Sequence, residues 1–212
     1  MPASLSSDVA FTPTVKAVQS ERGSRAAYAR VEAQGGFETG VTPELAAFLE
    51  GVDTAYLATA SAAGQPYAQH RGGPKGFIRP LDDKTVAFID YGGNRQYVTT
   101  GNLRENDQAF LFLMDYENRR RVKLWGHARV VPLDAALLQK LLPEGSHARP
   151  EQAILFTVSA WDVNCPQHIP QKLPAGEVAA ALRQMQGEVD ALKSENARLR
   201  ELARQSTAPS TK

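Results

Sequence analysis

The sequence has only one cysteine, Cys165, among its 212 residues. A single cysteine excludes a disulfide within the chain and a cysteine-based zinc site built from one copy. No stretch approaches the roughly 18 consecutive apolar residues of a transmembrane helix, and residues 1–25 lack the apolar core of a signal peptide. We therefore expect a cytoplasmic protein that does not engage a membrane.

An excess of charge of either sign is also missing, because 24 Lys and Arg residues oppose 23 Asp and Glu residues and leave a net charge of +1. This balance argues against a protein that coats nucleic acid, and it restricts any basic site to a compact patch. The chain has no P-loop, GxGxxG, GxSxG or HExxH spacing. We expect no metal and no nucleic-acid partner, and the motifs assign no catalytic residue.

The first part of the chain, residues 1–40, reads as a loose arm followed by a helix from Thr14 to Val31. A short second helix is predicted from Pro43 to Leu49. Thr42 supplies its N-cap, Pro43 suits its first position, and Glu44 favours its positive end.

From residue 54 the pattern changes to short β-prone runs separated by turns. Such close spacing leaves no room for the crossover helices of a parallel sheet, so the strands should be antiparallel. We predict a mainly β (α+β) barrel with helices at about 95–104 and 134–142. The expected strands are 54–60, 66–72, 76–80, 85–91, 109–116, 121–132 and 153–163.

The C-terminal segment 177–205 repeats apolar residues at alternating spacings of four and three, which is typical of a coiled coil. The polar Asn196 at an a position favours two parallel strands in register. An amphipathic helix packed on its own barrel would show a similar stripe, and both interpretations stay open. Residues 206–212 are expected to be disordered. The register places Leu182, Val189 and Asn196 at a, Met185, Leu192 and Leu199 at d, Glu188 and Glu195 at g, and Lys193 and Arg200 at e.

Basic residues gather in HRGGPKGF at 70–77 and in GGNRQYVTTGN at 92–102. Asn94 is the expected cap of a helix that begins with Arg95, so free backbone N–H groups would lie beside a guanidinium. Arginine together with a helix N-terminus suits a phosphate group. The alternative is a set of ordinary surface basic residues near glycine turns.

The ordered segments HRGGPKGF, TVAFIDYGGNRQYVTTGNL, AFLFLMDY and RRRVKLWGHARVV resemble the FMN-binding split barrel of the pyridoxamine 5'-phosphate oxidase family. SAWDVNCPQHIPQ resembles the subgroup of related FMN-binding proteins. The resemblance covers a domain at 41–172. It implies an antiparallel split barrel with flanking helices, FMN as cofactor, and a homodimer with the flavin sites at its interface.

The resemblance also implies roles for individual residues. His70, Arg71 and Lys75 match the strand that reads the flavin phosphate and ring edge, with Arg71 as phosphate ligand and Lys75 near the pyrimidine side. Ile89 and Asp90 match the strand that lines the flavin. Asn94, Arg95 and Gln96 match the phosphate-binding turn, with glutamine where the oxidases carry lysine, and Arg121 stands where the family often has glutamine.

One departure bears on function. The arginine-rich, tryptophan-containing signature of the true oxidases has no match after residue 170, so oxidation of pyridoxamine phosphate is not expected. In its place stands NCPQHIPQ, whose Asn164, Gln167 and His168 are expected to reach the flavin across the dimer interface.

Two functions follow from the resemblance. The first is an FMN-dependent oxidoreductase that acts on a small molecule and takes reducing equivalents from NADH, NADPH or a small reductant. The alternative is a non-catalytic flavin-binding sensor or carrier that uses the coiled coil for assembly. Haem or deazaflavin in the same barrel is a third possibility.

Overall fold

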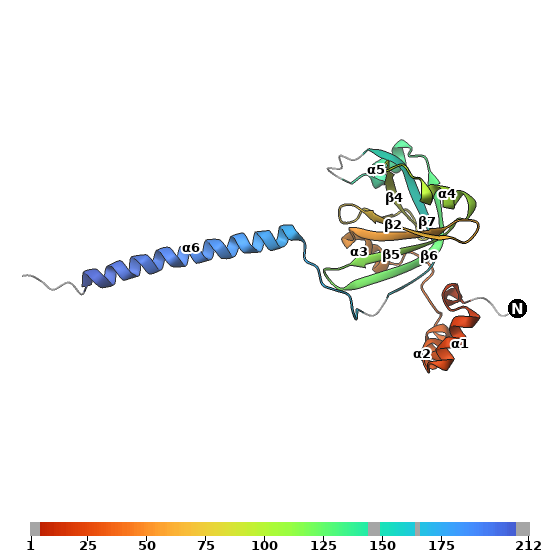
Figure 1. Ribbon diagram of the computed structural model, residues 1–212, viewed down its shortest axis with the longest axis horizontal. Coiled ribbons are helices and arrows are strands. Elements are labelled where there is room, and N and C mark those ends of the chain that lie inside the picture. The colour runs from red at the N-terminus through yellow and green to blue at the C-terminus, as the bar shows by residue number, and fades with distance from the viewer. Residues whose placement is uncertain (1–4, 144–148, 164–165, 207–212) are drawn as a thin grey trace, which may run out of the picture. The chain divides into compact units, whose positions relative to one another are not determined.

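The computed structural model describes residues 5–143, 149–163 and 166–206 of the chain. The chain divides into two compact units, Met1–Ile169 and Pro170–Lys212. The first unit contains all seven strands found in the described ranges, together with the shorter helices, and the second contains one long helix (Figure 1).

The strands form a single antiparallel sheet in the order β2-β1-β5-β6-β7-β4-β3. The sheet curls so that its inward side chains make one core, which confirms the predicted antiparallel split barrel. The strands are β1 (Thr54–Ala60), β2 (Pro66–Gly72), β3 (Arg79–Pro80), β4 (Thr85–Tyr91), β5 (Gln108–Asp115), β6 (Arg120–Val131) and β7 (Pro150–Val163).

Alternation of side chains along the strands builds this core. In β1, Ala55 and Leu57 are fully buried, whereas Tyr56 between them is half-buried on the outer face. The predicted strand 76–80 is wrong over most of its length, since β3 consists only of Arg79 and Pro80. Proline has no N–H to donate to a ladder, which limits how far a strand can run at this edge.

A bulge bends the two longest strands where their register shifts between Trp125 and Gly126. A Cβ atom at Gly126 would lie 2.0 Å from the carbonyl oxygen of Thr157 and 2.9 Å from the ring of Phe156. Only glycine permits this close approach of β6 to β7, and the barrel depends on it for its curvature.

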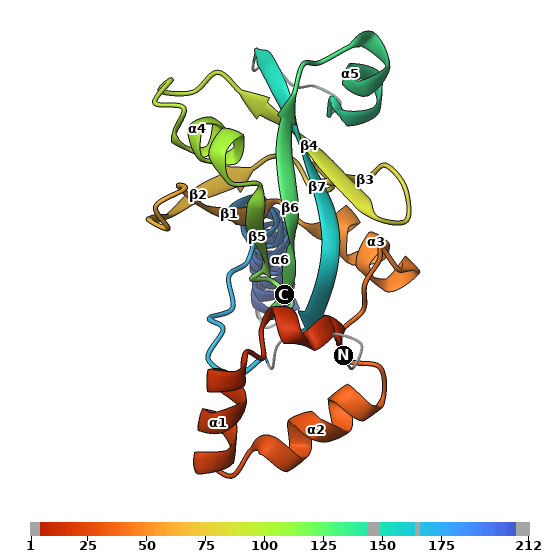
Figure 2. The same cartoon turned by 90° about the vertical axis from the view of Figure 1, so that its right-hand side faces the viewer.

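The N-terminal segment forms a helical hairpin, with a single 3₁₀ turn η1 (Ser6–Val9) before α1 (Pro13–Glu21) and α2 (Arg25–Ala33) (Figure 2). The predicted continuous helix from Thr14 to Val31 is wrong, because the chain turns at Gly23, whose φ is +77°. Phe11 joins the hairpin to the barrel. Its ring meets Phe37 at 5.2 Å, and Phe37 stacks on Trp125 at 5.4 Å.

Three more helices flank the barrel: α3 (Pro43–Gly51), α4 (Val98–Glu105) and α5 (Ala135–Leu141). The predicted cap of α3 is confirmed, because Thr42 Oγ1 accepts a hydrogen bond from the Leu45 amide at 3.3 Å. The side chain of Asp134 caps α5 in the same way, at 2.7 Å. Leu45 and Leu49 of α3 are fully buried in the main core.

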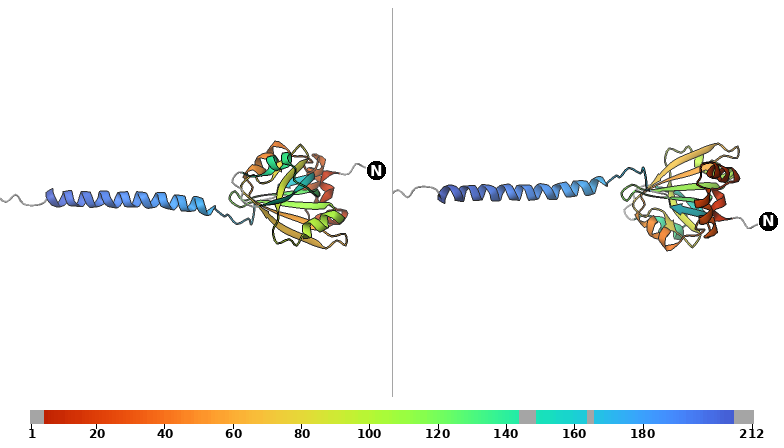
Figure 3. Two further views of the ribbon diagram at one scale, coloured as in Figure 1. Left: turned by 90° about the horizontal axis from the view of Figure 1, so that it is seen from above. Right: turned by 90° about the horizontal axis from the view of Figure 1, so that it is seen from below.

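The second unit contains α6 (Ala175–Ser206), one continuous helix in both views of Figure 3. It begins two residues before the predicted segment 177–205 and includes Ser206, which was expected in the disordered tail. Residues 207–212 lie outside the described residues. Within the described ranges, no helix combines the length and the apolar character needed to cross a membrane.

Candidate functional site

The barrel is closed at its split by a side-chain ion pair between two strands that share no backbone ladder. Arg71 of β2 contacts Asp90 of β4, and their side chains are 11% and 12% exposed. Both point inward, since Arg71 lies opposite the buried Ala55 and Asp90 follows the buried Phe88 at strand spacing. The pair therefore joins the two sides of the split from within.

A hydrogen-bonded network extends this ion pair to α4 and β7. Gln69 Oε1 accepts bonds from Arg71 Nη2 at 2.9 Å and from Thr99 Oγ1 at 2.8 Å. The amide nitrogen of Gln152 donates to Asp90 Oδ2 at 2.8 Å and to Thr100 Oγ1 at 3.0 Å. Four elements thus fix the position of one guanidinium and one carboxylate.

One donor in this network is left without an acceptor. The Nε of Arg71 is buried and has no hydrogen-bond partner among the described residues. An unsatisfied buried donor is costly, and it marks a place where a ligand or water supplies an acceptor. Arg71 borders a cavity of about 60 Å³ that is also lined by Gln69, Asp90, Tyr91, Gly93, Asn94, Arg95, Tyr97, Thr99, Thr100 and Glu151.

The turn before α4 lines part of this cavity. Asn94 Oδ1 accepts a bond from the Gln96 amide at 3.2 Å. The predicted helix start at Arg95 is wrong, because Arg95 and Tyr97 have left-handed φ values of 61° and 54° and α4 begins at Val98. Asn94 therefore shapes a turn rather than capping a helix.

Tyr97 links this turn to β7. Its hydroxyl accepts a bond from Arg95 Nε at 3.3 Å and donates to Glu151 Oε1 at 2.7 Å. The bond to Tyr97 raises the pKa of Arg95, which keeps this guanidinium charged at any ordinary pH. Two arginines and two carboxylates, Asp90 and Glu151, thus share the cavity wall.

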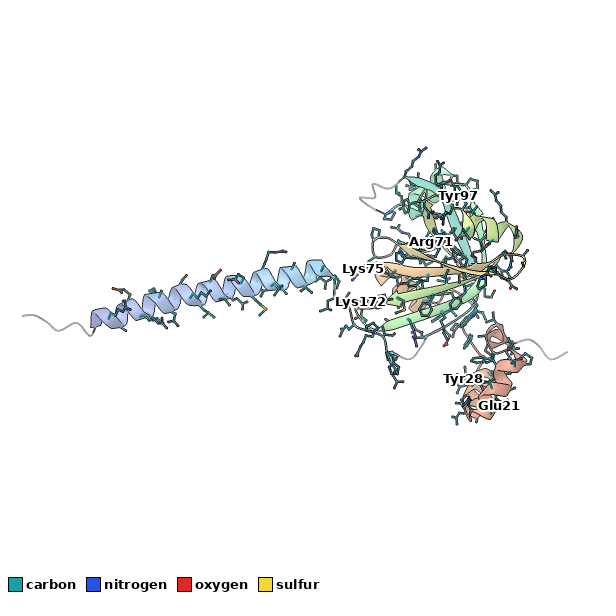
Figure 4. All side chains as sticks on the ribbon, viewed as in Figure 1. Glu21, Tyr28, Arg71, Lys75, Tyr97 and Lys172 are labelled. Carbon is teal, nitrogen blue, oxygen red and sulfur yellow. The ribbon has the colours of Figure 1, made fainter. Side chains whose placement is uncertain are left out.

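The other basic residues of the predicted cluster lie elsewhere. His70 is on the opposite face of β2 from Arg71, with its ring 5.6 Å from that of Tyr56. Lys75 Nζ contacts Glu117 Oε2 at 3.1 Å in the β5–β6 turn, apart from Arg71 (Figure 4). Ile89 packs against Leu141 of α5, on the far side of β4 from Asp90.

The remaining predicted residues do not line the cavity either. Gln96 is exposed, and Arg121 lies on the outer face of β6 with a buried Nε that also has no partner among the described residues. Gln167 and His168 are exposed after β7, and Asn164 lies outside the described residues. The structure thus brings together Arg71, Asp90, Asn94 and Arg95 of the predicted set.

Sequence reasoning missed the polar residues that hold Arg71 in place. Gln69 could have been found, because it stands two residues before Arg71 and strand alternation puts both on one face. Thr99 lies within the quoted segment 92–102, but its hydroxyl gave no signal of its own, and Glu151 and Gln152 are distant in sequence and belong to no motif. Only the closure of the barrel brings them to the cavity.

A second feature lies on the outside of the barrel. Half-buried aromatic rings cover neighbouring positions of β1, β5 and β6, and we call this set the aromatic face: Tyr56, Phe110, Phe112 and Trp125. Phe110 meets Trp125 at 5.3 Å, and Lys123 Nζ lies 5.1 Å from the centre of the Trp125 ring system. A cavity of about 500 Å³ adjoins Phe110, Trp125 and the exposed His127.

No group of three or more His, Cys, Asp or Glu side chains in the described part of the chain is arranged to hold a metal ion. The candidate site is therefore defined by the cavity at Arg71 and by the aromatic face.

Comparison with known proteins assigns the family. Residues 41–165 match the model of the pyridoxamine 5'-phosphate oxidase family, which is more than half of the chain. The chain belongs to this family, as the ordered segments predict. No curated protein matches the chain at a significant level.

Solved structures with a similar fold include HupZ of Group A Streptococcus, at 20% identity over 62% of this chain and 98% of that one, with a TM-score of 0.47. A second is a pyridoxamine 5'-phosphate oxidase homologue from Lactobacillus delbrueckii, at 19% identity over 59% and 95%, with a TM-score of 0.43. A third is an FMN-binding protein from Syntrophomonas wolfei, at 11% identity over 72% and 97%, with a TM-score of 0.46.

Proposed function

We propose that this protein is an FMN-binding oxidoreductase that works as a homodimer on a small molecule. The observation that carries the proposal is the buried, unpartnered Nε of Arg71 beside the cavity at the barrel split. A phosphate oxygen is an acceptor that suits this donor. The cavity of about 60 Å³ is far smaller than a site for a whole cofactor, so it fits the anionic end of FMN rather than its ring.

The residues around the cavity fit a phosphate in part. Arg71 and Arg95 supply positive charge, and Val98 begins a helix whose first amides are free of helical partners. Asp90 and Glu151 oppose this charge. In this proposal Arg71 binds the phosphate through Nε while Asp90 keeps its hold on Nη1, so the anion meets a guanidinium already fixed in orientation.

FMN supplies two-electron redox chemistry when it is bound, and we propose NADH or NADPH as the donor. The aromatic face is the proposed contact between the two barrels, because half-buried aromatic rings are typical of interface centres. His70 and Arg121 lie beside this face on β2 and β6. We propose that they contact a flavin ring held between two copies, and we propose the same role for Gln167 and His168 of the loop after β7.

Activity as a true pyridoxamine-phosphate oxidase is not proposed, since the C-terminal signature of those enzymes is missing and α6 follows instead. A non-catalytic flavin sensor or carrier is the second candidate. Asp90 favours it, because this cavity-lining carboxylate is held by Arg71 and Gln152 and is not available as a base.

The test is titration of the purified protein with FMN, followed by anaerobic addition of NADH or NADPH. We expect a yellow protein with one FMN per chain and rapid bleaching of its visible absorption by one of the two donors. FMN binding without bleaching would leave the sensor or carrier as the function. Absence of any FMN binding would refute both.

A further inference from the structure

An exposed apolar stripe runs along α6. Leu182, Met185 and Leu192 are 60%, 61% and 70% exposed, and Val189 and Leu199 are 42% and 52% exposed. Their alternating spacings of three and four residues place these side chains on one line along the helix. A line of large apolar side chains in contact with water is a surface for another helix.

We propose that α6 pairs with α6 of a second copy of this chain as a parallel, in-register coiled coil, and that this pairing keeps the flavin site complete at low protein concentration. The proposed pairing is inferred from α6 alone and does not depend on the proposed function. The effect on flavin rests on the proposed function, because it requires a site formed between two barrels.

Charges beside the stripe select a second copy in parallel orientation. Glu188 and Glu195 occupy g positions, and Lys193 and Arg200 occupy e positions. In a parallel pair, each glutamate at g lies next to the basic residue at the following e position of the other helix, five residues further along. In an antiparallel pair, glutamates would face glutamates and basic residues would face basic residues, which is unfavourable.

Asn196 fixes the register. It is the only polar residue at the a and d positions between Leu182 and Leu199. Two asparagines can bond to each other when the helices are parallel and unshifted, whereas any shift sets a buried amide against an apolar side chain. Glu195 also binds Arg198 within its own helix at 2.7 Å, so its carboxylate is shared in the pair.

The connection between the two units makes helix pairing matter for the barrels. Residues 170–174 separate Ile169 from the start of α6, and five residues span at most about 18 Å when extended. Paired helices therefore hold two barrels on short tethers, at an effective concentration of about 1 mM. Contact between the aromatic faces then no longer depends on dilution.

Charge-reversal variants distinguish an effect on helix pairing from an effect on the stability of the helix itself. We would compare Glu188→Lys/Glu195→Lys, in which both interfaces of a homodimer become wholly basic, with Lys193→Glu/Arg200→Glu, in which they become wholly acidic. Asp190→Lys/Glu201→Lys is the matched control, because it makes the same charge change at b and f positions away from the stripe. All variants are made in the full-length chain and studied by sedimentation velocity and by FMN titration across protein concentrations.

The full chain and the control should stay dimeric to the lowest concentrations tested. Each interface variant alone should dissociate at concentrations at least about tenfold higher, and a one-to-one mixture of the two should recover the dimer. In the dissociated variants FMN affinity should fall as the protein is diluted, by about tenfold or more, and mixing should restore it.

Three results would overturn the inference. A monomeric full chain would show that α6 does not pair with a second copy, and equal dissociation of control and interface variants would show that the e and g charges do not direct pairing. A dissociated variant whose FMN affinity is unaffected by dilution would refute the link to the flavin site. Failure of every variant to bind FMN would instead refute the proposed function, while sedimentation would still decide the pairing.

Discussion

Arg71 and Asp90 form the closure of the barrel, because β2 and β4 exchange no backbone hydrogen bonds with each other. Both side chains are nearly buried, and removal of one member of such a pair leaves a charge that neither water nor a partner compensates. The same arginine lines the cavity, and its buried Nε has no hydrogen-bond partner among the described residues. The structural role of Arg71 and its proposed role in ligand binding therefore fall on one residue, and substitutions at both positions can separate them.

The first prediction concerns this pair. Arg71→Met should lower the free energy of unfolding by about 2–4 kcal/mol, since it strands the Asp90 carboxylate. The double variant Arg71→Met/Asp90→Asn should regain most of that stability and still fail to bind FMN. Urea unfolding and FMN titration of the same samples measure the two effects. FMN affinity that recovers together with stability would show that Arg71 has only a structural role.

The second prediction concerns Gly126. Gly126→Ala should destabilise the barrel by about 2–4 kcal/mol, because its Cβ atom would lie 2.0 Å from the Thr157 carbonyl oxygen and would force β6 from β7. Gly101→Ala is the control, since a Cβ atom there meets nothing within 4 Å and alanine favours the helix α4 by about 0.5–1 kcal/mol. Thermal unfolding should therefore move in opposite directions for the two variants.

For single residues, the sequence predicts which kinds of side chain form the site better than it predicts which way each side chain points. Arg71 and Arg95 were predicted together and do meet at one cavity. His70 and Lys75 were grouped with them by closeness in sequence, although neighbours on a strand face opposite ways and Lys75 follows the end of β2. The left-handed turn at Arg95 was not predicted, because an asparagine before a helix is as typical of an N-cap as of the turn that Asn94 makes with the Gln96 amide.

Among the elements, the N-terminal hairpin depends most on charge. Glu32 of α2 contacts Lys16 of α1 at 3.0 Å and also Arg25, and its side chain is 9% exposed. Burial alone would raise the pKa of Glu32, but hydrogen bonds from Lys16 and Arg25 outweigh burial and lower it. The hydrogen bonds to Asp8 and Glu32 raise the pKa of Lys16.

The third prediction is the pH range of the hairpin. A lowered carboxyl pKa stabilises the fold above the ordinary value of 4.5 and loses this effect as the pH falls through the lowered value. As the pH falls below 4.5, the amide NMR signals of residues 13–33 should therefore shift toward unfolded positions before those of the barrel. Glu32→Gln should weaken the hairpin at neutral pH and remove this acid transition, whereas an unchanged transition in the variant would assign it to another carboxyl group.

The elements themselves were largely predictable. Short β-prone runs between turns located β1, β2 and β4 at their observed bounds, and the Thr42-Pro43 pair located the start of α3. The errors at Gly23 and β3 share a cause. In both segments the sequence pattern continues past a glycine or a proline. Packing in the folded protein, which the sequence pattern does not show, decides whether the helix or strand bends at that residue or ends there.

The molecule as a whole combines a unit with a buried core and a unit without one. Both tryptophans, Trp125 and Trp161, lie in the first unit, whereas α6 supplies a large share of the helical residues. The two units therefore have separate spectroscopic signals and separate sources of stability.

The fourth prediction follows from this division. Thermal unfolding of the full chain should show an earlier transition by circular dichroism at 222 nm than by tryptophan fluorescence, and the earlier one should move to higher temperature as protein concentration rises. A chain that ends after Gly176 should lose the earlier transition and keep the fluorescence transition at high concentration. Coincident transitions in the full chain would show that both units unfold as one.

The closure of the barrel also protects it from aggregation. β2 pairs on only one side, with β1, and an unpaired strand edge invites another chain to add to the sheet. An incoming strand at this edge would separate Arg71 from Asp90 and bury both charges, while Pro66 at the start of β2 offers no N–H for it to bond. We therefore expect the ion pair to oppose the addition of another chain at this edge, and its removal should expose the edge as a site for chain-to-chain addition.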